Sequence, residues 1–261
     1  MILLATALLS AFHIAVFGDN QGDGPGTPPF DNFACWVDSV GPLAIVGTGD
    51  HVSNPSCAFL RFLEAEPSFA GIFWPAVADA ENACWGRSQA DVGAGFPLLG
   101  YGAASFASIE GCSYAASLEL EGVDVRIVSI HFPDQPADPL EAFTPAAREF
   151  LAEVLEDCPD SALVIVVAHS RTGRWDNCLD GAVAALLERK ADLLLSGTIH
   201  VPLLLPGPVP SANAGSLTRP LVLFPPSFID LEVAPAESLT LRMMDASVSP
   251  PAVRREIPIT Y

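Results

Sequence analysis

The stretch GAVAALLERKADLLLSGTIH, residues 181–200, predicts a helix followed at once by a buried strand. The segment 181–191 has the length and composition of a helix, and the apolar run DLLLSG (192–197) has the length of a strand. A second run of strand length, ALVIVVA (162–168), comes before the helix. Strand, helix and strand in this order indicate a layered α/β fold.

A further helix is predicted over FTPAAREFLAEVLEDC, residues 143–158. Thr144 suits the N-cap and Pro145 suits the first helical position. Phe150, Val154 and their apolar neighbours fall on one face at helical spacing. Other short apolar runs predict buried strands: HIAVFG (13–18), LAIVG (43–47), GIFWPAV (71–77) and VRIVSI (125–130).

Glycine and proline mark two expected surface loops, NQGDGPGTPPFDN (20–32) and LLLPGPVPSANAGSLTRP (203–220). The last third then changes to short runs that indicate antiparallel strands closing a second sheet: LVLF (221–224), FIDLEV (228–233) and SLTLRMM (238–244). No long linker divides the chain, so we expect a single domain over residues 12–261.

The composition limits the partners that this chain can bind. Among 261 residues, 31 acidic and 12 basic side chains give a formal charge of −19. Such a surface repels phosphate backbones, which argues against nucleic acid as a partner. Half of the residues are hydrophobic and only 16% are charged, which excludes a disordered chain. A small substrate remains compatible with both numbers.

The amino terminus and the cysteines bear on the compartment. MILLATALLSAF, residues 1–12, is similar to the apolar core of a signal peptide cleaved after Ala11, although no Lys or Arg precedes it. We therefore expect export to the periplasm or the medium, or a cytoplasmic protein if residues 1–11 only lead into the first strand. Elsewhere no apolar segment reaches the roughly 18 residues of a membrane span. Six cysteines without a CxxC pair allow either disulfides or buried thiols.

Polar residues follow five of the predicted strands. The carboxyl ends of parallel strands meet at one edge, where ligands bind in α/β sheets. Carboxylate, amide and imidazole groups at that edge suit a hard or borderline divalent cation. The residues concerned are Asp19 and Gln21, Asp50, Asp79, His169 and His200.

The order of these pieces resembles the calcineurin-like metallophosphoesterases. Their motifs run D-x-H or D-x-Q, G-D-x-x-x-N/D, G-N-H-D/E, a strand-end His and G-H-x-H. The matching stretches are GDNQ (18–21), GDHVSN (49–54), ADAE (78–81), AHS (168–170) and GTIH (197–200). The resemblance covers residues 12–200 and implies a four-layer α/β/β/α sandwich with two mixed β-sheets.

The resemblance also implies a set of metal ligands. Asp19, Gln21, Asp50 and His200 would surround one cation, and Asp50 would bridge to a second cation held by Asp79 and His169. Two cations about 3.5–4 Å apart would clamp a phosphoryl group and activate a bridging hydroxide. An oxygen and nitrogen ligand set of this kind accepts Mn, Fe or Zn.

Three positions depart from the family pattern. Asp79 stands where the family has Asn, which keeps an oxygen ligand. Ala80 replaces the His that assists the leaving group, and loss of a general acid typically costs about 10²–10⁴-fold in rate. Thr198 replaces the first His of the last motif, so we expect a weakened second metal site.

Other side chains could take over part of the missing chemistry. Arg87 and Arg171 could fork onto phosphate oxygens and stabilise charge in the transition state, and His51 could donate a proton. The alternative for the arginines is a surface ion pair in an acidic protein, and for His51 a simple loop histidine.

Three functional hypotheses follow. The first is a metal-dependent hydrolase acting on a small phosphomonoester or phosphodiester, with one or two divalent cations. The second is a catalytically impaired protein that keeps the fold as a binding module, which Ala80 and Thr198 favour. The third, the endonuclease/exonuclease/phosphatase fold, lacks its G-D-F/W-N motif here and conflicts with the acidic charge.

Overall fold

The computed structural model describes residues 10–20, 26–51, 69, 71–78, 106–110, 112–131, 145–169, 181–218, 220, 223–234 and 238–260. These residues form two β-sheets. The strands of the first sheet are β1 (Phe12–Phe17), β2 (Ala44–Gly47), β3 (Phe73–Pro75), β11 (Ser227–Ala234), β12 (Ser238–Asp245) and β13 (Ala252–Thr260). Those of the second sheet are β4 (Phe106–Glu110), β5 (Ser113–Leu120), β6 (Val123–Ile130), β7 (Leu163–Ala168), β8 (Leu193–Ser196), β9 (Pro202–Leu205) and β10 (Ser211–Ala214).

Both sheets are mixed. The first has the order β13-β12-β11-β1-β2-β3, with parallel pairing among β1, β2 and β3 and antiparallel pairing from β1 out to β13. The second has the order β4-β5-β6-β7-β8-β10-β9, with a parallel centre from β6 to β10 and antiparallel strands at both edges.

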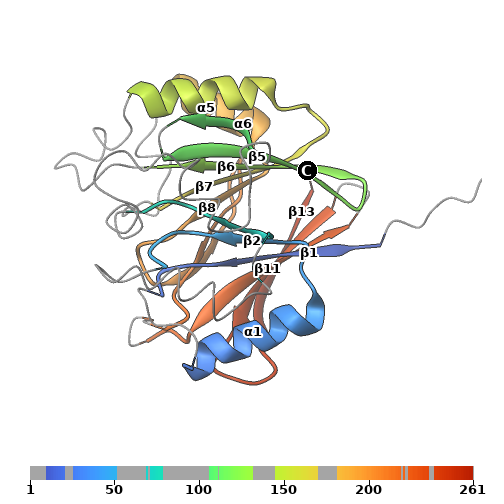
Figure 1. Cartoon of the computed structure of the whole chain (residues 1–261), viewed down its shortest axis with the longest axis vertical. Coiled ribbons are helices and arrows are strands. Elements are labelled where there is room, and N and C mark those ends of the chain that lie inside the picture. The colour runs from blue at the N-terminus through green and yellow to red at the C-terminus, as the bar shows by residue number, and fades with distance from the viewer. Residues whose placement is uncertain are drawn as a thin grey trace, which may run out of the picture.

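Helices cover the outer faces of the two sheets. In Figure 1, α5 (Pro145–Asp157) and α6 (Gly181–Lys190) lie over the second sheet, and α1 (Pro28–Val40) lies on the opposite side of the molecule, against the first. The layers are therefore helix, sheet, sheet and helix. The predicted α/β/β/α sandwich with two mixed sheets is confirmed.

The hydrophobic pattern explains this layering. All six residues of β7 are buried, as expected for a strand covered on both faces. Alternate residues of the second sheet pack inward against the first sheet or outward against α5 and α6. Each large apolar side chain buried in this way contributes about 1.5–3 kcal/mol.

All six strands predicted before residue 200 are present, as are both predicted helices. The strands β4, β5 and β13 were not predicted. At the carboxyl end the predicted antiparallel strands are confirmed as β11 and β12, and they extend the sheet of β1 instead of forming one of their own. Of the predicted strand LVLF, Leu221 and Val222 lie outside the described residues, and Leu223 and Phe224 are exposed and not part of a strand.

Both predicted loops contain regular structure, so these two predictions are wrong in part. Within 20–32, helix α1 begins at Pro28. Proline fits the first turn of a helix as well as a loop, so its presence does not distinguish the two. Phe30 and Phe33 of this helix are fully buried. Within 203–220, β9 and β10 pair with each other, and β10 also pairs with β8. Pro206 directly follows β9 and Pro210 directly precedes β10, so neither interrupts a strand.

Two other expectations meet the structure only in part. Cys35 and Cys158 carry free thiols, whereas Cys57, Cys84 and Cys178 lie outside the described residues. The candidate signal peptide falls mainly on residues 1–9, which are also outside them. Among the helices that are described, none has the length and apolar character needed to cross a membrane.

Candidate metal centre

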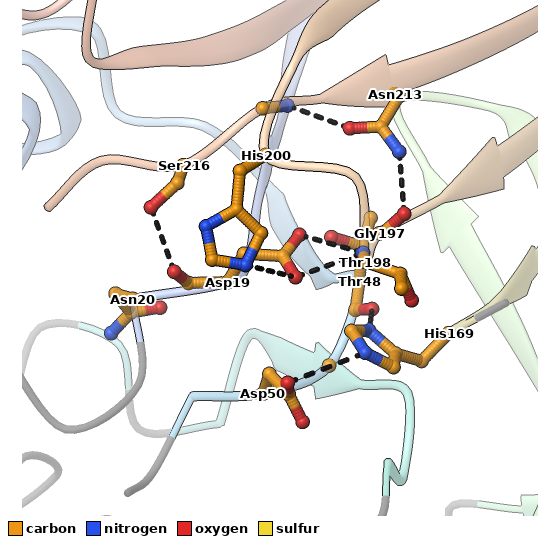
Figure 2. A network of polar contacts seen from close by, with 12 residues as sticks. Asp19, Asn20, Thr48, Asp50, His169, Gly197, Thr198, His200, Asn213 and Ser216 are labelled. Atoms are coloured by element: carbon orange, nitrogen blue, oxygen red, sulfur yellow. Dashed lines mark hydrogen bonds and ion pairs between the residues drawn. The ribbon is translucent and has the colours of Figure 1, made fainter. Parts of the chain in front are cut away.

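Four of the predicted ligands lie at the carboxyl ends of neighbouring parallel strands, two in each sheet. Strands β1 and β2 end at paired residues in the first sheet, and β7 and β8 do so in the second. Asp19 and Asp50 follow the first pair of strands, and His169 and His200 follow the second. Figure 2 shows the four side chains converging from these loops.

The distances define a compact group. One ligand atom from each of Asp19, Asp50 and His169 lies within 4.8 Å of the others. His169 Nε2 is 3.4 Å from Asp50 Oδ2, and His200 Nε2 is 3.5 Å from Asp19 Oδ1 (Figure 2). Two carboxylates and an imidazole at this spacing form a donor set that suits a divalent cation.

Four other predicted site residues lie outside the described part of the chain. They are Gln21, Asp79, Arg87 and Arg171. Their predicted roles as metal ligands or as charge-stabilising arginines stay predictions.

A hydrogen bond fixes the orientation of His169. Its Nδ1–H donates to the carbonyl oxygen of Thr48 over 2.8 Å, so that Nε2 faces Asp50 (Figure 2). Metal-binding histidines in proteins typically donate their second ring N–H to a carbonyl or carboxylate in this way. Thr48 follows β2 and His169 follows β7, so this bond also joins the two sheets.

The buried carboxylate of Asp19 makes a second contact between the sheets, because Asp19 follows β1 and its partner Thr198 follows β8. The backbone N–H of Thr198 donates to both of its oxygens, at 2.8 and 3.0 Å. Asp19 has no exposed surface, and a buried carboxylate without such partners would be costly. Thr198 thus contributes its amide where the family pattern has an imidazole.

The backbone of the ligand loops is unusual. Positive φ angles occur at Asp19 (54°), Asp50 (54°), Thr198 (75°) and His200 (52°). Elsewhere in the described residues the only other non-glycine with positive φ is Glu121, in the turn between β5 and β6. Such conformations cost on the order of 1–3 kcal/mol and concentrate at functional sites.

Strand β10 and the segment that follows it hold the loops by hydrogen bonds that the sequence did not predict. Asn213 Nδ2 donates to the Gly197 carbonyl over 2.6 Å, Ser216 Oγ to that of Asp19 over 2.7 Å, and Thr218 Oγ1 to that of Asn20 over 2.8 Å. The only sequence signal was a set of small polar residues in SANAGSLT, which the neighbouring prolines obscured.

Burial and the neighbouring charges shift the pKa values of the ionisable groups in the site. Burial raises the pKa of Asp19 to about 6, against the opposing effects of His169, His200 and the Thr198 amide. Burial alone would lower the pKa of His169, but the hydrogen bond to Asp50 and the charges of both carboxylates raise it to about 9. The raised pKa of His169 reflects the negative charge of the two carboxylates, which favours a bound cation, whereas the raised pKa of Asp19 reflects the cost of burying its charge.

His51, a predicted catalytic residue, is buried beneath the site. Burial, followed by the charge of His169, lowers its pKa to about 3. Its two ring nitrogens lie 3.1 Å from Asn20 Oδ1 and 3.3 Å from the Gly49 backbone nitrogen. The predicted role as a proton donor stays a prediction.

Comparison with known proteins identifies the fold. No protein-family model and no curated protein matches the sequence. Among solved structures, a dimetal phosphatase from Danio rerio gives a TM-score of 0.62 at 13% identity, over 96% of this chain and 99% of that one. A purple acid phosphatase from yellow lupin (Lupinus luteus) seeds gives 0.60 at 13% identity, over 96% of this chain and 54% of that one.

A third similar structure has a name that does not refer to hydrolysis. Vacuolar protein sorting 29 from Cryptosporidium parvum gives a TM-score of 0.52 at 12% identity, over 96% of this chain and 99% of that one. The chain has the fold shared by these proteins, that of the calcineurin-like metallophosphoesterases. The resemblance predicted from the motifs is therefore confirmed at the level of the fold.

A pair of glycine substitutions tests the close packing of the loops. A Cβ at Gly197 would lie 2.6 Å from both His169 Nδ1 and the Thr48 carbonyl oxygen. We expect Gly197→Ala to lower the free energy of unfolding in urea by about 1–3 kcal/mol, as overpacking does, and to weaken Mn²⁺ binding measured by titration calorimetry.

Gly181→Ala is the matched control. Nothing lies within 4 Å of a Cβ there, at the start of α6, so it should be neutral or stabilising by up to about 1 kcal/mol. Equal behaviour of the two variants would contradict the packing described for Gly197.

Proposed function

We propose that this chain is a metal-dependent phosphoesterase acting on a small phosphomonoester or phosphodiester. The observation that carries the proposal is the group of Asp19, Asp50 and His169. Their ligand atoms lie within 4.8 Å of one another at the carboxyl ends of β1, β2 and β7. The fold is shared with a dimetal phosphatase and a purple acid phosphatase.

The donor set fits a divalent cation. It combines carboxylate oxygens with an imidazole whose Nδ1–H is held by a backbone carbonyl, and such sets accept Mn, Fe or Zn. When bound, the cation would supply Lewis acidity towards a phosphoryl oxygen and lower the pKa of water. The side chain of His200 lies next to Asp19 and is 17% exposed, similar to the 15% of Asp50.

In this proposal each residue has a defined task. Asp19 and Asp50 bring negative charge from the first sheet, and His169 and His200 bring imidazoles from the second. Asp79 and Gln21 complete the ligand set by analogy with the family motifs. Arg87 and Arg171 would contact the phosphate oxygens. The net charge of −19 supports a small ester over a polynucleotide.

The second cation would be held more weakly than the first. Its expected ligands include Asp50, Asp79 and His169, but Thr198 offers no imidazole. The amide of Thr198 already donates to Asp19, and its Oγ1 is a buried neutral oxygen. A neutral hydroxyl is a poorer donor to Mn, Fe or Zn than imidazole.

A binding protein without turnover is the second candidate. The fold shared with a vacuolar sorting protein supports it, together with Ala80 and Thr198 at positions where the family has histidines. Such a protein would keep the cation at Asp19 and Asp50 and would not hydrolyse esters.

Hydrolysis of chromogenic phosphate esters separates the two candidates. With added Mn²⁺, Fe²⁺ or Zn²⁺ the wild type should turn over p-nitrophenyl phosphate or its diester, and Asp50→Asn should reduce the rate to background because a charged ligand is lost. Asp160→Asn is the control, since that carboxylate is 92% exposed at its side chain. Absence of turnover in the wild type, or full activity in Asp50→Asn, would contradict the hydrolase.

Restoring the missing acid tests the match of the third motif. Ala80→His should raise the rate of ester hydrolysis, towards the about 10²–10⁴-fold that a general acid contributes. Steady-state kinetics with a poor leaving group, such as phenyl phosphate, give the clearest readout, because protonation matters most there. If Ala80→His left the rate unchanged or lowered it with both p-nitrophenyl phosphate and phenyl phosphate, ADAE (78–81) would not correspond to the third family motif.

A further inference from the structure

The loops that carry Asp19 and Asp50 are joined by a buried pair of neutral side chains, Asn20 and His51. Each is 1% exposed. Asn20 directly follows Asp19, and His51 directly follows Asp50, so the pair connects the residues next to the two carboxylates. No motif of the sequence required either residue.

The hydrogen bonds determine the state of the imidazole. The backbone N–H of Gly49 can only donate, and it lies 3.3 Å from His51 Nε2, so this nitrogen accepts. In the neutral ring the proton is then on Nδ1, which lies 3.1 Å from Asn20 Oδ1 and donates to it. The amide of Asn20 is oriented accordingly, with Nδ2 donating to the His51 carbonyl over 3.5 Å.

The surroundings leave this ring little freedom. The rings of Phe17 and Phe73 lie 4.8 and 5.2 Å from it between centroids. On the other side of the pair, Thr218 Oγ1 holds the Asn20 carbonyl, and the Asp19 N–H donates to the Gly49 carbonyl over 2.9 Å. The pair is therefore fixed from both sides.

We propose that Asn20 and His51 are positioning residues that set the separation and direction of the Asp19 and Asp50 carboxylates for a shared divalent cation. This inference rests on the proposed function. It assigns His51 to the support of the ligands, because both ring nitrogens are already used within the loops. The left-handed backbones of Asp19 and Asp50 make such support necessary, since neither conformation is favoured by the chain itself.

A double-mutant cycle in Mn²⁺ affinity tests the proposal. His51→Phe keeps an aromatic ring between Phe17 and Phe73 and removes both ring hydrogen bonds, whereas Asn20→Ala removes the partner. Each should weaken Mn²⁺ binding in titration calorimetry by about 10–100-fold, as loss of supporting hydrogen bonds does. The double variant should bind about as weakly as the weaker single variant, because both changes break one unit.

Ser113→Ala is the control for general loss of stability. It removes a hydrogen bond from the His131 backbone to the buried Ser113 hydroxyl, outside these loops. We expect it to lower the thermal midpoint without changing Mn²⁺ affinity. Variants of Asn20 and His51 that bind Mn²⁺ as tightly as the wild type, or whose effects on Mn²⁺ affinity simply add, would overturn the proposal.

A measurement on the wild type covers the case in which the variants do not fold. ¹⁵N-edited NMR of the imidazoles should show His51 with its proton on Nδ1 and with slow exchange. A proton on Nε2 would overturn the hydrogen-bond assignment and with it the positioning role. If the wild type itself bound no Mn²⁺, the proposed function would fail. If the wild type bound Mn²⁺ and the variants of Asn20 and His51 bound it equally well, only the positioning role would fail.

Discussion

The contact between the Asp19 carboxylate and the Thr198 amide is the constraint on which the site depends. Asp19 is fully buried at the end of the first sheet, so its charge must be met by hydrogen bonds and cations. Thr198 comes from the second sheet, and its N–H reaches both carboxylate oxygens. The hydrogen bond between His169 and the Thr48 carbonyl is a second connection between the sheets, from the end of β7 to the end of β2. Together these two bonds join the two sheets in the alignment that brings Asp19, Asp50 and His169 within 4.8 Å of one another, with His200 next to Asp19.

Much of this arrangement could be predicted from the sequence, because the strands are continuous apolar runs that end in polar residues. Runs such as ALVIVVA have no alternation, so they indicated buried parallel strands, and parallel strands end at a common edge. The placement of Asp19, Asp50, His169 and His200 at strand ends follows from that geometry. The resemblance to a known family then supplied the two-sheet architecture, which the apolar pattern does not determine.

The elements that were missed have local signals that compete with tertiary structure. Helix α1 begins with prolines after a glycine-rich segment, and β10 lies between prolines, so local composition favoured loops at both places. His51 was expected as a proton donor, but its pairing with Asn20 could not be found from sequence, because it depends on two loops 31 positions apart meeting beneath the site. Thr198 was noted as a lost imidazole, but its amide contact with Asp19 depends on a left-handed backbone that no sequence pattern announces.

The central claim is that the carboxylates and imidazoles at the strand ends of the two sheets form a cation site. Anomalous scattering from a crystal of the wild type soaked in Mn²⁺ tests it most directly, since it locates the cation without reference to any activity. We expect a strong peak in contact with Asp19, Asp50 and His200, and a weaker peak or none beside His169, where Thr198 stands in place of an imidazole. A crystal with no peak at these side chains under the same soak, or with Mn²⁺ bound only elsewhere, would contradict it.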